Sequence, residues 1–279
     1  MEKNHVIRIK CKDRKGLIAG ISGALYNYNH NILVMKEFVE TATETFFARL
    51  EVSGELDTRK IQDALTTLLP PEATINIIPK RKKDIVILVT REHHCLSDLL
   101  VRHYFNELHA NIQAVIGNYD SLRPFTDKFN IPYHYISHEQ IDQPAFETAL
   151  LETLELYQPD YLILAKFMRI LSPGFVARYP ERIINIHHSF LPAFKGANPY
   201  KKAFERGVKL IGATAHLVNN DLDDGPIITQ KIIPVQHDDE LRDMVEAGHE
   251  IEKSVLADGL KMILEDRVFV SVNKTIIFN

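Results

Sequence analysis

The residues best suited to chemistry lie in two polar segments. Asn185 and His187 are two residues apart on an expected strand, so both side chains point to one face. An amide and an imidazole on one face can stabilise the oxyanion that forms when a carbonyl is attacked. Asp221, Asp223 and Asp224 crowd a later turn, where neighbouring like charges are expected to keep a carboxyl pKa raised and favour a general base. The two segments together suggest acyl chemistry.

Spacing alone leaves other interpretations open. His187 could be a hydrogen-bonded structural histidine, and the aspartates could cap a turn. A metal site built from His187, His188 and His216 is not expected, because adjacent strand residues face opposite ways and no carboxylate completes a recognised pattern. Cys95 precedes a helix, where a thiolate could be favoured, but packing under the turn is the preferred interpretation.

The elements that must position these residues form an alternating series after residue 84. Strands are expected at 85–89, 112–116, 133–136, 161–164 and 182–186, with helices near 96–108, 124–129, 144–157 and 173–179. This order predicts a Rossmann-like α/β domain over 84–279 with a mostly parallel sheet, whose ligands bind beyond the carboxyl ends of the strands. A strand pair at 212–218 and 226–235 and an amphipathic helix near 238–265 follow.

Residues 1–80 show a different pattern. Strands are expected at 6–11, 32–39, 46–52 and 73–78, with helices near 16–28 and 58–69. The order βαββαβ predicts a ferredoxin-like sheet with two helices on one face. Asp13 is a candidate cap for the first helix. The basic run at 79–84 is interpreted as a solvated linker between the two domains.

Composition limits the classes of partner. The chain has 279 residues, a formal net charge of −4 and two cysteines, which argues against a nucleic-acid partner and a disulfide framework. No apolar run reaches the length of a membrane span, and the start lacks a signal or transit pattern, so we expect a cytoplasmic protein without a membrane partner. The turn at 90–97 contains no glycine, so dinucleotide or P-loop binding is not expected.

The two polar segments together resemble the folate-dependent formyltransferases. The central motif of that family corresponds to Asn185-x-His187 followed by Ser189-Phe-Leu-Pro192, and its acidic partner corresponds to Asp223. A further segment matches the residues that contact the pterin ring, namely Phe167, Met168, Arg169, Ile170 and Leu171. The resemblance extends from about residue 84 to the last residue.

The N-terminal unit resembles an ACT domain, a small amino-acid-sensing module, through Asp13-Arg-Lys-Gly-Leu-Ile18. An ACT domain joined to a formyltransferase-like domain is the arrangement of the formyltetrahydrofolate deformylase family. His94-Cys-Leu96 and the segment Lys195-Gly-Ala-Asn-Pro-Tyr200 also fit that family. The resemblance implies a homo-oligomer with an amino-acid effector, such as glycine or methionine, bound near Asp13, Gly16 and Leu17.

The resemblance also implies an activity. Water would attack the formyl group of 10-formyltetrahydrofolate, releasing formate for purine synthesis and tetrahydrofolate, with no cofactor besides this substrate carrier. Asn185 and His187 would stabilise the oxyanion, Asp223 would position or deprotonate the water, and His187 is the expected proton donor to N10. His94 and His216 are further candidates for substrate binding, and His216 could instead support Asp223 or be structural.

Two rival functions are weighed. A transferase that formylates glycinamide ribonucleotide would need a glycine-serine-asparagine phosphate loop, and this chain has Ile116-Gly-Asn118. A transferase acting on initiator tRNA would call for a further basic domain. A folate sensor without catalysis would not need Asn185, His187 and Asp223. One departure from the family is Lys201-Lys-Ala, where histidine, glutamine and alanine are expected.

Overall fold

The computed structural model describes residues 4–192 and 199–279. The chain divides into two compact units, one up to Arg81 together with Ile277–Asn279, and the other over Lys82–Ile276. No helix in the described residues is long and apolar enough to span a bilayer.

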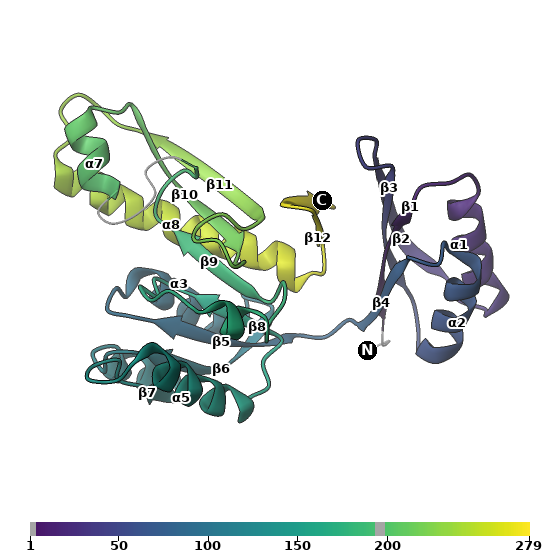
Figure 1. The fold of residues 1–279 in the computed structure, drawn as a ribbon, viewed down its shortest axis with the longest axis horizontal. Helices are drawn as coiled ribbons and strands as arrows, with labels where there is room; N and C mark the ends of the chain where they lie inside the picture. Colours follow the sequence, from purple (N-terminus) through teal and green to yellow (C-terminus); the bar gives the residue numbers. More distant parts are fainter. Residues whose placement is uncertain (1–3, 193–198) are drawn as a thin grey trace. The chain divides into compact units, whose positions relative to one another are not determined.

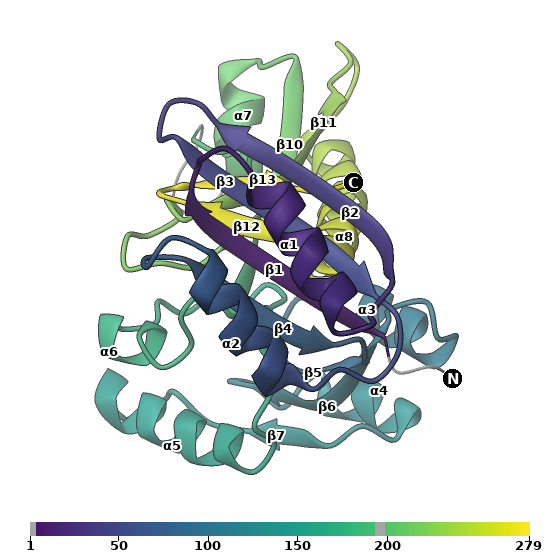
Figure 2. The same ribbon diagram turned by 90° about the vertical axis from the view of Figure 1, so that its right-hand side faces the viewer.

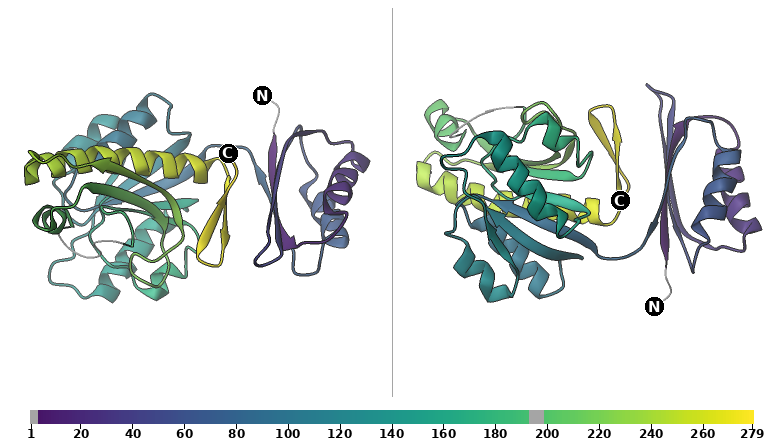
Figure 3. Two further views of the ribbon diagram at one scale, coloured as in Figure 1. Left: turned by 90° about the horizontal axis from the view of Figure 1, so that it is seen from above. Right: turned by 60° about the horizontal axis from the view of Figure 1, so that its bottom comes forward.

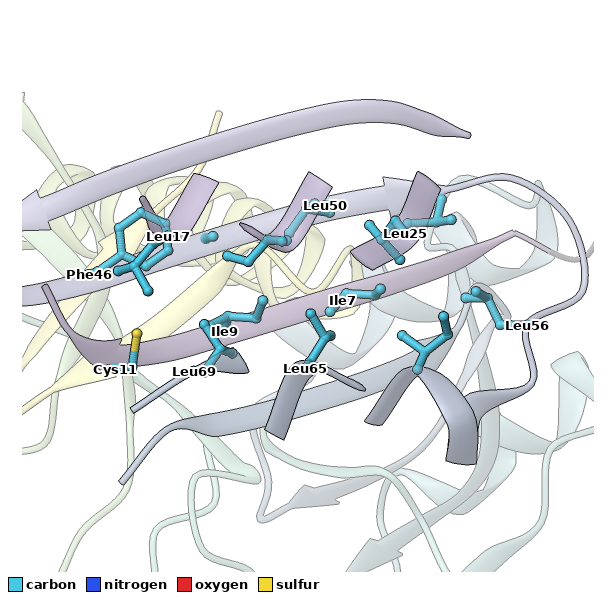
Figure 4. Packing of buried hydrophobic residues seen from close by; sticks show 14 residues of the cluster. Ile7, Ile9, Cys11, Leu17, Leu25, Phe46, Leu50, Leu56, Leu65 and Leu69 are labelled. Carbon is cyan, nitrogen blue, oxygen red and sulfur yellow. The ribbon is translucent and has the colours of Figure 1, made fainter. Parts of the chain in front are cut away.

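The N-terminal unit has the predicted order βαββαβ. Its elements are β1 (His5–Lys12), α1 (Leu17–Asn27), β2 (Ile32–Glu40), β3 (Thr45–Val52), α2 (Thr58–Leu68) and β4 (Thr74–Pro79). The antiparallel sheet has the order β2-β3-β1-β4, and α1 and α2 lie across one face of it (Figure 2). Apolar side chains between helices and sheet, among them Ile7, Leu25, Leu50 and Leu65, form the core (Figure 4).

The start of α1 differs from the prediction. Gly16, not Asp13, occupies the position before the first helical residue, with a left-handed φ of 87° and no side-chain cap. Glycine adopts this conformation without a Cβ penalty. The backbone N–H of Asp13 instead donates to the carbonyl oxygen of Glu44 at 2.8 Å. The cap prediction was wrong because the chain turns once more between Asp13 and the helix. Leu17, the first residue of α1, is buried.

The larger unit is the predicted α/β domain (Figure 1). Its strands are β5 (Lys83–Val89), β6 (Ala110–Gly117), β7 (Tyr133–Tyr135), β8 (Tyr161–Leu164), β9 (Ile183–His187), β10 (Leu210–Leu217) and β11 (Ile227–Pro234). They form one sheet of order β11-β10-β9-β8-β5-β6-β7, parallel from β9 to β7 and antiparallel at β10 and β11. The strand order reverses beside β5, and ligands bind at such switch points.

Helices follow the strands as expected. They are α3 (His94–Tyr104), α4 (Arg123–Thr126), the 3-10 turn η1 (Asp127–Phe129), α5 (Gln143–Glu155), α6 (Pro173–Val176), α7 (Pro199–Arg206) and α8 (Leu241–Leu264). The long α8 packs against β9, β10, β11 and α3 (Figure 3). The sequence analysis did not identify α7 or the hairpin of β12 (Val268–Ser271) and β13 (Lys274–Ile277). These elements are too short to show a clear periodicity.

Candidate active site

A cavity opens at the carboxyl ends of β8 and β9. It encloses about 230 Å³. Its walls are the segment after β8, the end of β9 and the loop after β10, with lining residues Leu164, Lys166–Leu171, Asn185–His188, His216 and Val218–Asp223. We call it the first cavity. It contains all the predicted catalytic residues and the whole predicted pterin-contact segment.

Asp223 and His187 form the central pair of the site. His187 Nδ1 lies 3.2 Å from Asp223 Oδ1, and both side chains are largely buried. Asp223 has a φ of 53°, in the left-handed region that aspartate tolerates better than most residues. A Cβ at Gly225 would lie 1.8 Å from the carbonyl oxygen of Leu217, so the loop that carries Asp223 folds this tightly only with glycine there.

The protonation state of Asp223 differs from the expectation. Burial favours a higher pKa, but the hydrogen bond and charge of His187 outweigh it and lower the pKa of Asp223 below its ordinary value. The expected raised pKa was wrong because the nearest groups are imidazoles and not the neighbouring aspartates. Asp223 is therefore an ionised acceptor at neutral pH.

Asn185 is oriented by His216. The two residues face each other across the antiparallel pair β9–β10. His216 Nδ1 lies 2.9 Å from the carbonyl oxygen of Leu217, so it carries the proton, and Nε2 accepts from Asn185 Nδ2 at 3.1 Å. Burial lowers the pKa of His216, which keeps the ring neutral. His216 Nε2 is 3.9 Å from Asp223 Oδ1, so its hydrogen-bond partner is Asn185.

His187 keeps one nitrogen available. Its Nε2 is buried and has no hydrogen-bond partner among the described residues. The ring stacks on His188, with centroids 5.1 Å apart. The expectation that adjacent residues face opposite ways fails here because β9 ends at His187. Burial, reinforced by the charge of Lys166, lowers the pKa of His188 to about 4. We call Asp223, His187, Asn185 and His216 the Asp223 cluster.

The predicted pterin-contact segment forms one wall of the first cavity. Its backbone is fixed at two points: the N–H of Met168 donates to Thr90 Oγ1 at 2.9 Å, and the carbonyl oxygen of Ile170 accepts from Gln143 Nε2 at 3.0 Å. Met168 and Ile170 are 54% and 66% exposed, so the wall presents apolar surface beside polar backbone. Such a wall suits a flat, hydrogen-bonding ring.

His94 lies elsewhere, in a second buried cluster. Its Nε2 donates to Glu252 Oε2 at 2.8 Å, and its ring stacks on His249 at 4.0 Å. Tyr200 OH donates to Glu252 Oε1 at 2.6 Å, and Lys166 Nζ is 3.1 Å from Glu252 Oε2. We call Glu252, Lys166, His94 and Tyr200 the Glu252 cluster. His94 is not among the residues that line the first cavity.

The sequence analysis did not identify Glu252 or Lys166. Glu252 is fully buried although it lies within the apolar face of α8, and that break in the pattern was the signal available. Burial raises the pKa of Glu252, but the His94 hydrogen bond, the Lys166 charge and the Tyr200 hydroxyl lower it to about 2. Glu252 is therefore an anion at neutral pH, stabilised by these partners.

Possible metal ligands converge away from the first cavity. Among the described residues, the convergent groups are Glu92–His94–His249 and His94–Cys95–Glu252. His187 and His216 belong to neither. Burial raises the pKa of Cys95 well above its ordinary value, so it is a packed thiol and not a thiolate. Residues 195–198 of the motif that ends at Tyr200 lie outside the described residues.

Comparisons with known proteins identify the family of the chain. Residues 83–260 match the family model described as formyl transferase. The formyltetrahydrofolate deformylase of Haemophilus influenzae is 48% identical over 277 residues, covering 99% of this chain and 100% of that one. A crystal structure of a formyltetrahydrofolate deformylase from Pseudomonas syringae pv. tomato superposes with a TM-score of 0.95 at 37% identity, covering 100% of this chain and 95% of that chain. Glycinamide ribonucleotide transformylase 1 from Symbiobacterium toebii has a TM-score of 0.68 at 26% identity, covering 71% of this chain and 95% of that chain.

Proposed function

Because the chain belongs to the formyltetrahydrofolate deformylase family, we propose that it hydrolyses 10-formyltetrahydrofolate to formate and tetrahydrofolate. The observation that carries this proposal is the convergence of Asn185, His187 and Asp223 on one cavity at the carboxyl ends of β8 and β9, the edge of the sheet where ligands of such folds bind. As part of the same proposal, the enzyme acts in the cytoplasm and supplies formate for purine synthesis.

The chemistry follows from the free atoms of the Asp223 cluster. The formyl carbon lies near Asn185 and His187 Nε2, whose N–H groups donate to the oxyanion. Ionised Asp223 accepts a hydrogen bond from the attacking water and holds Nδ1 of His187 in its protonated form. The water oxygen bonds to the formyl carbon while Asp223 takes one proton from the water. The carbon–N10 bond then breaks, and a proton passes to N10 because an amine anion is a poor leaving group; the proton on Asp223 then replaces the one delivered. His187 Nε2 is the group placed to deliver the proton to N10.

The pterin ring of the folate lies against the wall formed by Phe167–Leu171. The fixed backbone groups beside Met168 and Ile170 pair with the polar edge of the pterin, while the exposed apolar side chains cover its face. In this arrangement N10 and the formyl group extend toward the end of β9. His216 lines the same cavity and acts by orienting the amide of Asn185.

Incubating the pure protein with 10-formyltetrahydrofolate and no acceptor tests the proposal. We expect formate and tetrahydrofolate in equal amounts, and a loss of about 10²–10⁴-fold in kcat for Asp223→Asn. Asp238→Asn, which changes an exposed aspartate, is the matched control and should behave like wild type. Tight folate binding without formate release by the wild type would instead favour a transferase lacking its acceptor or a sensor.

We propose a regulatory role for the N-terminal unit, residues 1–80, as an ACT domain that acts on the catalytic domain, residues 84–279. The turn of Asp13, Gly16 and Leu17 would bind a small amino acid such as glycine or methionine at a contact between subunits of a homo-oligomer. The left-handed Gly16 leaves backbone groups accessible at the start of α1. Equilibrium dialysis with both amino acids, with sedimentation analysis, tests this role; no binding would refute it.

A further inference from the structure

A second cavity lies next to the first and shares part of its wall. It encloses about 400 Å³. Its lining combines charged, polar and apolar residues: Glu92, Lys166, His188, Pro199, Tyr200, Lys201, Leu241, Val245 and His249. Lys166 and His188 line both cavities. Lys201, where the sequence departs from the family pattern, borders the second cavity.

Lys166 is held firmly in this shared wall. Its side chain is 4% exposed, and its Nζ lies 3.1 Å from Glu252 Oε2 and 3.5 Å from Glu92 Oε2. Its backbone has a φ of 62°, a left-handed conformation that is uncommon for lysine and redirects the chain as it leaves β8. Glu252 is itself fixed by His94 and Tyr200. Moving the ammonium group would take the lysine cation away from the fully buried carboxylate of Glu252.

The position of the wall matters for the choice of nucleophile. In the proposed function the folate substrate fills the first cavity, so a nucleophile larger than water needs another way to the formyl carbon. The second cavity has room for such a nucleophile. It also lies close to the reacting group, because His188, one of its lining residues, stacks on His187. Lys166 and His188 stand between this space and the reacting group.

We propose that Lys166, held by Glu252, separates the two cavities and thereby limits the formyl acceptor to water. This inference rests on the proposed function. Attack by an amine would form a carbon–nitrogen bond, break the carbon–N10 bond and move a proton from the amine to N10, so it needs no chemistry beyond that of hydrolysis. What prevents it is access. Lys166 is thus a specificity-determining residue of this reaction.

The test measures how the formyl group divides between water and an added nucleophile. The full-length protein is given 10-formyltetrahydrofolate with hydroxylamine or the larger methoxyamine, and formate and the formylated nucleophile are quantified together. The variants are Lys166→Ala/Glu252→Gln, which removes the wall, and Lys166→Met/Glu252→Gln, which refills most of its volume. Both replace the Glu252 carboxylate by an amide, so neither leaves it as a buried charge without a partner. The measured quantity is the ratio of formylated nucleophile to formate, which does not depend on the fraction of each variant that is active.

We expect the ratio of formylated nucleophile to formate to rise about tenfold for the alanine double variant, and more for methoxyamine than for hydroxylamine. The methionine double variant should stay within about twofold of wild type, as expected for side chains of similar volume. Lys83→Met/Asp266→Asn, which removes another buried ion pair of the same unit, controls for general loosening and should match wild type. Equal ratios in wild type and both Lys166 variants would overturn the inference alone. An absence of formate from wild type without nucleophile would overturn the proposed function instead.

Discussion

The Asp223 cluster and the Glu252 cluster each pair a largely buried carboxylate with a histidine, but they differ in whether every polar atom has a hydrogen-bond partner. Both oxygens of Glu252 accept from buried donors, so that cluster is saturated. In the Asp223 cluster the Nε2 of His187 is buried without a partner among the described residues. A buried polar atom left unpaired costs about 1–3 kcal/mol, so an unpaired atom beside a cavity marks the place where a ligand supplies the partner.

The comparison predicts that a saturated cluster supports stability and an unsaturated one supports turnover. The two roles can be separated experimentally. Substitutions in the Glu252 cluster should change the free energy of unfolding, and substitutions in the Asp223 cluster should change kcat. Lys166 belongs to the Glu252 cluster and also lines the first cavity, so it is the residue at which the two roles meet.

The largest effect is expected for His187→Gln. This change removes the imidazole that pairs with Asp223 and supplies the free Nε2, so kcat for formate release should fall by about 10²–10⁴-fold. The free energy of unfolding should change little. Steady-state kinetics and urea unfolding measure the two quantities. A variant that keeps full activity would remove His187 from the mechanism.

Breaking the saturated cluster should act mainly on stability. Glu252→Ala leaves Lys166 buried without its main counter-ion, and we expect the free energy of unfolding to fall by about 3–5 kcal/mol. Asp266→Ala, which breaks the buried pair with Lys83, is the matched control and should give a similar loss. Urea unfolding followed by circular dichroism measures both. Wild-type stability in Glu252→Ala would show that the cluster contributes nothing.

The pH dependence of stability tests the contribution of the Glu252 carboxylate directly. The pKa of Glu252 is lowered from 4.5 to about 2, so its contribution is fully present above 4.5 and is lost as the pH falls through about 2. The shift corresponds to roughly 3 kcal/mol. The stability difference between wild type and Glu252→Gln should therefore shrink from about pH 6 to about pH 2.5. Parallel curves across that range would contradict the lowered pKa.

The smallest effect is expected for His216→Ala. The amide of Asn185 loses the acceptor that orients it, so kcat should fall by about tenfold, the value of one hydrogen bond of ordinary strength. The KM for 10-formyltetrahydrofolate should stay nearly unchanged, since His216 acts through the amide of Asn185 in the proposed function. A change confined to KM would place His216 in substrate binding instead.

Local patterns were enough to predict much of the fold. Alternating and 3.6-residue periodicities of apolar residues predicted the strands and most helices of both units. They do so because the buried face of a strand or helix is formed by residues at a fixed, short spacing in the sequence. The period of two along β9 also predicted that Asn185 and His187 share a face, and both line the first cavity. Asp13 as a cap was wrong because one left-handed glycine changes where a helix begins.

The sequence by itself determined which residues have suitable chemistry and which strand presents them. Only the tertiary structure decided how those residues are charged and paired. Asn185 meets His216 because the two are register partners in the antiparallel pair β9–β10, and the pKa of Asp223 falls because the loop after β10 brings it to His187. His94 and Glu252 are 158 residues apart in the chain, yet one hydrogen bond joins them. Electrostatic pairing depends on distance in space, which local periodicity does not encode.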